Sequence, residues 1–184
     1  MRLAPLFALI AAPVWADTCP PGQDYSAELS ALADQANAAP DERSGRAVSG
    51  KMWQLWLRAP DAASQAVLDQ GMRQRESHDF SGAYASFARL ADYCPNYAEG
   101  YNQRAYINFL RGHFAAALVD LDAALALSPN HVGAQSGRAL TLLQLGRIDT
   151  ARMQLKAALE NNPWLSERAL MEKGGPLAPP GEDI

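Results

Sequence analysis

Small and apolar residues recur along the chain with a fixed spacing of 34 residues. The recurring positions fall into four classes, and each class has one member in each of three successive units. The classes are Pro95, Pro129 and Pro163; Ala83, Ala117 and Ala151; Gly71, Ala105 and Ala139; and Phe87, Leu121 and Leu155. A period of this length is typical of stacked structural repeats. The pattern therefore predicts three units without insertions, at residues 64–97, 98–131 and 132–165.

Within each unit the pattern predicts two short helices joined by a tight turn. In the middle unit, Leu118 and Leu121 belong to an apolar stripe at helical spacing. Gly112 and Gly146 stand where the first helix of a unit should end with a positive φ, and His78 takes the matching place in the first unit. Two short helices cannot bury both of their apolar faces alone, so neighbouring units must stack.

The middle unit resembles the tetratricopeptide repeat. The residues that match this family are Tyr101, Ala105, Ala117, Leu121, Ala124 and Pro129. The third unit has Gln135 at the aromatic position, and the first unit is the most divergent, with Val67 at that position and Leu90 in place of Ala124. The resemblance covers about 100 of the 184 residues. It implies an all-α, right-handed α-solenoid of three units, which is a scaffold for binding.

The first 16 residues have the composition of a secretory signal peptide. A positive charge precedes an apolar run at residues 3–12, and small residues lead up to Ala16. The run is too short to span a bilayer, so we expect cleavage near Ala16, no membrane insertion afterwards, and a periplasmic or secreted chain. A buried N-terminal helix is the alternative, which Pro5 and Pro13 disfavour.

Residues 17–63 are expected to form an N-terminal arm and a helical hairpin. Tyr25 and Leu29 belong to the apolar face of the first helix, and Pro40 can open the second. Trp53 and Trp56 make the second helix apolar over a wider stripe than one partner needs. We expect the hairpin to stack on the first repeat.

The segments after the repeats are short. Residues 166–173 are expected to form a capping helix on the third unit. Residues 174–184 are rich in Gly and Pro, and a disordered tail is expected there.

Charge and motifs exclude several classes of function. The formal net charge is −4 and no basic run is present, so nucleic acid is not an expected partner. His78, His113 and His131 fall between helices, and we interpret them as surface turn residues rather than metal ligands. No serine lies in a nucleophile elbow, and the glycines form no phosphate-binding loop. We therefore expect no enzymatic activity, no metal and no cofactor.

Cys19 and Cys94 are the only cysteines in the chain. In an exported protein an even number of cysteines favours a disulfide. The bond would tie the N-terminal arm to the end of the first repeat. The alternative is two free thiols, with Cys94 buried as a small apolar residue.

By the resemblance, the first helices of the three units line an inner, concave groove that binds a partner. The groove positions are Leu68, Asp69, Met72, Arg75, Glu99, Asn102, Tyr106, Phe109, Leu110, Ser136, Leu140 and Leu143. Tyr106 and Phe109 lie at the centre, where aromatic anchors contribute most to binding. The alternative is that Leu110 and Leu143 pack on neighbouring helices and that the C-terminal tail fills the groove.

One subclass of the family grips the carboxylate ends of chaperone tails with cationic and amide side chains at fixed inner positions. The residues at those positions here are Leu68, Met72, Gln103, Gly133 and Gly137. Only Gln103 is a good partner for a carboxylate, so this activity is not expected.

Two functions remain open at this point. The first is a periplasmic adaptor that holds a peptide or a helix of a protein partner in its groove, for instance in envelope assembly or maturation. The second is a self-associating structural module, which would form a homodimer by burying Trp53 and Trp56 against another copy. The sequence names no partner.

Overall fold

The computed structural model describes residues 18–181 of the chain. The predicted signal segment, residues 1–16, lies outside the described residues, as do residues 182–184. Within residues 18–181 every regular element is a helix. No helix in this part of the chain combines the length and the apolar character that crossing a membrane would require.

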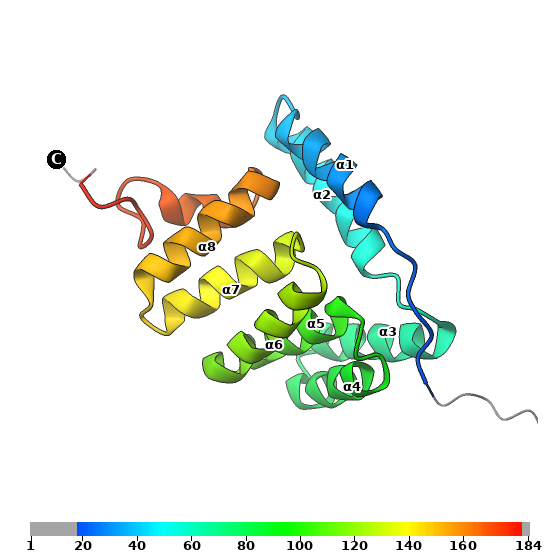
Figure 1. Ribbon diagram of the computed structural model, residues 1–184. Helices are drawn as coiled ribbons and strands as arrows, with labels where there is room; N and C mark the ends of the chain where they lie inside the picture. The colour runs from blue at the N-terminus through cyan, green and yellow to red at the C-terminus, as the bar shows by residue number, and fades with distance from the viewer. Residues whose placement is uncertain (1–17, 182–184) are drawn as a thin grey trace, which may run out of the picture.

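The three predicted units form three antiparallel helix pairs that stack in chain order (Figure 1). The helices are α3 (Ala62–Glu76) and α4 (Phe80–Tyr93), α5 (Ala98–Leu110) and α6 (Phe114–Leu127), and α7 (Val132–Gln144) and α8 (Ile148–Asn161). Each helix packs on the next, from α3 through to α8. The predicted all-α solenoid is therefore confirmed.

Small residues allow the two helices of each pair to approach closely. Ala83, Ala117 and Ala151 are fully buried. At Gly71 there is no room for a side chain, because an added Cβ would lie 2.5 Å from an atom of the Phe87 ring. These contacts explain why the repeat keeps small residues at these positions, since larger side chains would overpack the interface.

The turn inside each unit has the backbone conformation that the sequence predicts. His78, Gly112 and Gly146 have φ values of 62°, 76° and 72°. This left-handed conformation ends a helix at little cost for Gly and is tolerated by His better than by most other residues.

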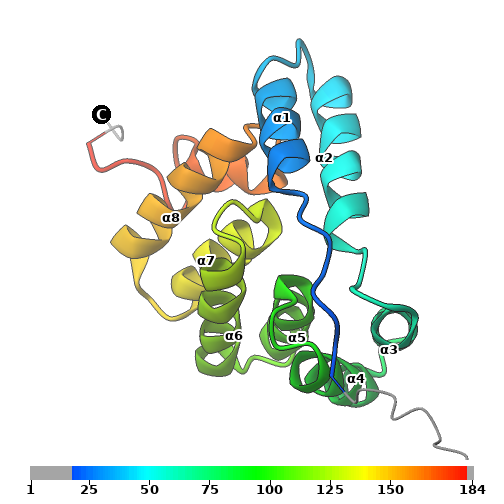
Figure 2. The same cartoon turned by 45° about the vertical axis from the view of Figure 1, so that its right-hand side comes forward.

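The N-terminal hairpin consists of α1 (Ser26–Asn37) and α2 (Glu42–Trp56). The expectation that it stacks on the first repeat is wrong, because it lies across the solenoid and packs on α8. Figure 2 shows α1 beside α8, while α3 follows only after the connection that leaves α2. The Trp164 indole donates to the Ala36 carbonyl at 2.8 Å, and the Asn162 amide donates to the Ser49 hydroxyl at 2.7 Å.

Two tryptophan–glycine contacts explain this placement of the hairpin. A Cβ atom at Gly45 of α2 would overlap the indole ring of Trp164, which follows α8. Conversely, a Cβ atom at Gly133 of α7 would lie 2.6 Å from the Trp53 ring of α2. Each aromatic ring therefore fills a notch in the other part of the molecule. The hairpin joins the third repeat in this way and closes the solenoid across its inner face.

The C-terminal segment is folded back on the third unit. Residues Ser166–Met171 form a 3-10 helix, η1, where a capping helix was expected. The expectation of a disordered tail is wrong for residues 174–181, because Leu177 is fully buried in one cluster with Leu142 and Leu155. The Leu177 amide also donates to the Leu170 carbonyl at 2.9 Å. Burial of one apolar side chain thus orders a segment that is rich in Gly and Pro.

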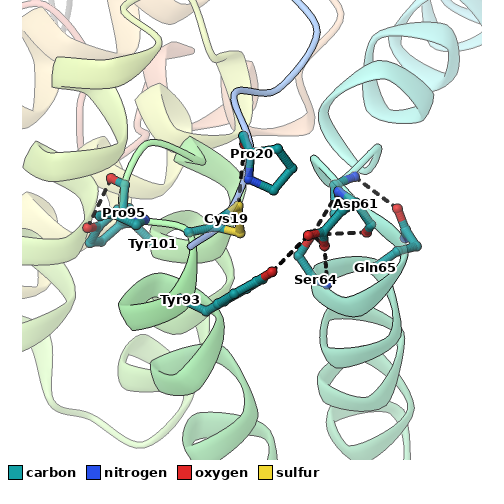
Figure 3. Close-up of a disulfide and its surroundings, with 10 residues drawn as sticks. Cys19, Pro20, Asp61, Ser64, Gln65, Tyr93, Pro95 and Tyr101 are labelled. Atoms are coloured by element: carbon teal, nitrogen blue, oxygen red, sulfur yellow. Dashed lines mark hydrogen bonds between the residues drawn. A yellow bond between two sulfur atoms is a disulfide. The ribbon is translucent and has the colours of Figure 1, made fainter. Parts of the chain in front are cut away.

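The predicted disulfide is present between Cys19 and Cys94, with 5.0 Å between the Cα atoms. It fastens the N-terminal arm, residues 18–25, to the end of α4 (Figure 3). Cys94 is buried, and Tyr93 beside it donates a hydrogen bond from its hydroxyl to the Asp61 carboxylate at 2.8 Å. Asp61 also caps α3 through Ser64. The arm, α4 and the start of α3 are therefore joined at one place.

The Gly45 notch makes a prediction with a control in the same helix. We expect Gly45→Ala to lower the free energy of unfolding by about 1–3 kcal/mol, because the new methyl group must displace Trp164. Gly50→Ala meets nothing within 4 Å, and we expect it to raise the free energy by about 0.5–1 kcal/mol. Urea denaturation followed by circular dichroism measures both. Equal effects of the two substitutions would contradict the notch.

The disulfide makes a second prediction. The bonded cysteines are 75 residues apart, so the chain-entropy model gives the bond about 4 kcal/mol of stabilisation. We expect Cys19→Ser to lose about that amount in urea denaturation, and the wild type in reductant to match it. If the variant unfolds at the same urea concentration as the oxidised wild type, the bond does not contribute to stability.

Candidate binding groove

The inner face of the solenoid carries a partly open cavity of about 400 Å³, which we call the groove. Half of the predicted groove residues line it. They are Arg75 from α3, Asn102, Tyr106 and Phe109 from α5, and Ser136 and Leu140 from α7. Trp53 of the hairpin and Glu167 of η1 complete the wall. The repeat pattern in the sequence does not predict these two groove residues, because both come from outside the repeats.

The other predicted groove residues lie elsewhere. Leu68, Asp69 and Met72 line a separate pocket of about 260 Å³ beside Leu57. Leu110 is 40% exposed at the end of α5 and does not line the groove. Leu143 packs against the core formed by α7 and α8, as the alternative interpretation of that residue expected.

The open surface of the groove combines aromatic rings with polar groups. Tyr106 is 47% exposed, and its ring lies 5.5 Å below the guanidinium carbon of Arg75. Arg75 donates to the Gln103 side-chain oxygen at 2.8 Å, which fixes the guanidinium at the rim. The Phe109 ring packs edge-on against Phe114 at 5.3 Å. The groove therefore offers one accessible aromatic ring and one oriented cation.

Glu99, also predicted to face the groove, does not line it and is buried at 1% exposure. Its carboxylate accepts hydrogen bonds from the side-chain amides of Gln103, at 2.5 Å, and Asn102, at 2.9 Å. A third contact, of 2.8 Å, joins it to Nε2 of His131. A buried carboxylate needs such donors, because burying a charge without hydrogen-bond partners strongly raises the free energy of the folded state. This polar network orients Asn102 and Gln103, which line the groove.

His131 is fully buried, so the interpretation of all three histidines as surface turn residues is wrong for this one. Nδ1 of His131 accepts from the Ala134 backbone N–H at 3.2 Å, and the ring thereby caps α7. Nε2 must then carry the proton and donate to Glu99, since one ring nitrogen is the donor in neutral imidazole. His78 and His113 are exposed.

Trp53 and Trp56 do not form an exposed face, which corrects the surface assumed for self-association. Trp56 is only 7% exposed, and its ring stacks on His131 with 4.1 Å between ring centres. Trp53 meets His131 edge-on at 5.8 Å. Trp56 is covered and Trp53 is half-buried, because α2 turns its apolar stripe toward the start of α7.

No metal-binding arrangement is found in the part of the chain that the structure describes. Among residues 18–181 no three His, Cys, Asp or Glu side chains lie close enough together to hold an ion.

The half-buried Tyr97 makes a prediction for alkaline pH. Its hydroxyl donates to the Trp56 carbonyl at 2.6 Å. Burial, and then the charges of Glu99 and Asp69, raise the pKa of Tyr97 above its usual value. The unfolded chain loses this proton at a lower pH than the folded chain does. The contribution of Tyr97 to the free energy of unfolding is therefore fully present below about pH 10. Above that pH the free energy of unfolding falls by up to about 1.4 kcal/mol per pH unit.

The comparison of wild type with Tyr97→Phe measures this contribution. Urea denaturation between about pH 9 and 11 should show a shallower loss of stability in the variant. Identical slopes for the two proteins would show that Tyr97 does not resist ionisation in the folded state.

The repeat region of the chain is similar to known proteins. Residues 108–167 match the family model described as tetratricopeptide repeat. The Tetratricopeptide repeat protein 36 homolog of Nematostella vectensis is 42% identical over 70 residues, which cover 38% of each chain. Tetratricopeptide repeat protein 36 of Bos taurus is 33% identical over 122 residues, 64% of this chain and 65% of that protein. The chain thus spans less than two thirds of the length of these relatives.

A solved structure shows the same fold. The first tetratricopeptide domain of Spaghetti (RPAP3), bound to an HSP90 peptide, has a TM-score of 0.56 at 22% identity. The match covers 58% of this chain and 84% of that one. The family model and the relatives show that the repeat units are similar to tetratricopeptide repeats, and the solved structure shows the same fold.

Proposed function

We propose that the chain is an exported adaptor protein that holds an extended peptide segment of a protein partner in its groove. The observation that carries the proposal is the groove itself, where Tyr106, Phe109 and Trp53 line a cavity together with Asn102 and Gln103, whose side-chain amides are hydrogen-bonded to Glu99. The related fold of Spaghetti is bound to a peptide in its solved structure, which supports a protein-binding role of the same general kind.

The size of the groove favours an extended segment over a helix. An α-helix with its side chains is about 10–12 Å across. The groove has a volume of about 400 Å³ and is narrowed by Trp53, which rests on Gly133. This volume lies near the lower end of the range for small-ligand sites, about 300–1,000 Å³. One or two side chains of an extended segment fit such a space.

The partner proposed here differs from the acidic chaperone tails that one subclass of the family binds. Leu68 and Met72 lie in another pocket, and Trp53 covers Gly133. Arg75 is the one basic residue that lines the groove. The Arg75 guanidinium lies next to the Tyr106 ring. This pair suits a partner that brings an apolar or aromatic side chain together with one neighbouring acceptor group.

Export to the periplasm, with a role in envelope assembly or maturation, forms part of the proposal. The signal-like composition of residues 1–16 supports it. A disulfide that joins the arm to α4 supports it as well, because such bonds persist in oxidising compartments.

The proposal predicts that Tyr106→Ala and Phe109→Ala together abolish peptide capture. A peptide selected on the wild-type protein from a random library would serve as the ligand, with affinity measured by calorimetry. Truncation of a central aromatic anchor costs roughly 2 kcal/mol or more, so each single variant should bind about 30-fold more weakly.

Val119→Ala and Met153→Ala are the matched controls, since these side chains are 68% and 64% exposed on α6 and α8 and lie outside the groove. They should leave the affinity unchanged, and all variants should keep cooperative melting. If the selected peptides bind the Tyr106/Phe109 variant as tightly as the wild type, the groove is not the binding site.

A further inference from the structure

Two charged side chains of opposite sign line the groove, and they come from opposite ends of the repeat region. Arg75 belongs to α3 of the first unit, and Glu167 belongs to η1, after the third unit. Neither forms an ion pair with any side chain in residues 18–181. By contrast, Arg104 of α5 pairs with Asp120 of α6 at 2.6 Å. The groove therefore holds one base and one acid that the fold itself leaves unpaired.

Arg75 is held in place but keeps hydrogen-bond donors for a ligand. Its Nη1 donates to the Gln103 side-chain oxygen at 2.8 Å, and its guanidinium lies over the Tyr106 ring. Its Nε and Nη2 groups have no acceptor in the described part of the chain, and they are not closed off from solvent. The planar fork of donors in a guanidinium matches a carboxylate. The part of the groove beside Tyr106 therefore suits an acidic group.

Asn102 supplies a third uncommitted group, which is an acceptor. The residue lines the groove and is only 6% exposed. Because an ionised carboxylate can only accept, the amide nitrogen of Asn102 must face Glu99, at 2.9 Å. The Asn102 side-chain oxygen then has no donor within residues 18–181, yet it is not closed off from solvent. Since buried polar groups are normally hydrogen-bonded, this oxygen indicates a donor that a ligand brings, such as a main-chain N–H.

Resting on the groove as the peptide site proposed above, we infer that the segment it binds carries one acidic and one basic side chain, with an apolar or aromatic residue between them. The acidic side chain pairs with Arg75, and the basic one pairs with Glu167. The residue between them lies against the Tyr106 ring, and one main-chain N–H donates to Asn102. Complementary charges of this kind select among partners more than they add affinity. A segment with charges of one sign would leave one of the two groove charges unpaired.

The test begins with peptides selected from a random library on the full chain. We expect the peptides selected on the wild type to carry both charges around an apolar or aromatic residue. Selection on Arg75→Gln should lose the acidic preference and keep the basic one, and selection on Glu167→Gln should do the reverse. Arg73→Gln and Glu172→Gln are the matched controls, because both side chains are exposed and do not line the groove. These controls should select the same peptides as the wild type.

Calorimetry with one synthetic peptide from the wild-type selection then assigns each contact. Replacing its acidic residue by Gln should weaken binding to the wild type at least fivefold and should not weaken binding to Arg75→Gln any further. Replacing its basic residue by Gln should behave in the same way toward Glu167→Gln. Methylation of one main-chain N–H of the peptide should also weaken binding at least fivefold, which tests the contact with Asn102 without altering the protein. Peptides that lack either charge, independent effects of the paired substitutions, or full affinity after methylation at every position would each overturn the inference.

The Tyr106/Phe109 variant distinguishes failure of this inference from failure of the proposed function. If that variant loses the selected peptides while Arg75→Gln and Glu167→Gln bind them as the wild type does, the groove is the peptide site but its charges do not select the partner. If the variant keeps the selected peptides, the groove is not the peptide site, and the proposed function fails together with this inference.

Discussion

The contact between Trp56, His131 and Glu99 joins three elements that are distant in the chain. Trp56 belongs to the hairpin, Glu99 to α5, and His131 stands at the start of α7. The stacked rings add stabilisation beyond their buried area, and the His131 N–H helps to satisfy a carboxylate that is cut off from water. Loss of a partner from a buried charge typically costs about 3–5 kcal/mol. The position of the hairpin and the orientation of Asn102 and Gln103 in the groove therefore depend on one polar contact.

Closure by the hairpin determines which surfaces remain for binding. Three stacked repeats alone would leave the whole inner face open, whereas here α2 crosses it and Trp53 narrows the groove beside Gly133. On the other side, Trp56 and the arm shape a second cleft with a different charge. Two tryptophans three positions apart in α2 thus line two different cavities. One helix that is not part of the repeats sets the shape of both.

The sequence predicts the repeats well, because each contact between the helices of a unit depends on residues at a fixed spacing. Ala83, Ala117 and Ala151 are an example, and they are fully buried. The docking of the hairpin has no such local signature. Trp164 fills a notch at Gly45, more than 100 residues earlier in the chain, and the same pattern of apolar residues would also suit stacking on α3. Leu177 illustrates the same limit, since one buried side chain orders a segment whose composition indicates disorder. Half of the groove residues predicted from repeat positions do line the groove. Trp53 and Glu167 could not be predicted in this way, because they come from the flanking segments.

The closed arrangement bears on how such a groove can bind. A peptide that enters a flexible solenoid must order both itself and the protein, and each immobilised side chain lowers the affinity. Here the hairpin bonds to residues near the end of the last repeat through Ser49 and Asn162, and the disulfide fastens the arm to the first repeat. Asn102 and Gln103 are already oriented by Glu99 before any ligand arrives. The ordering cost on the protein side is therefore met during folding, so a groove of modest volume can retain useful affinity for a short segment.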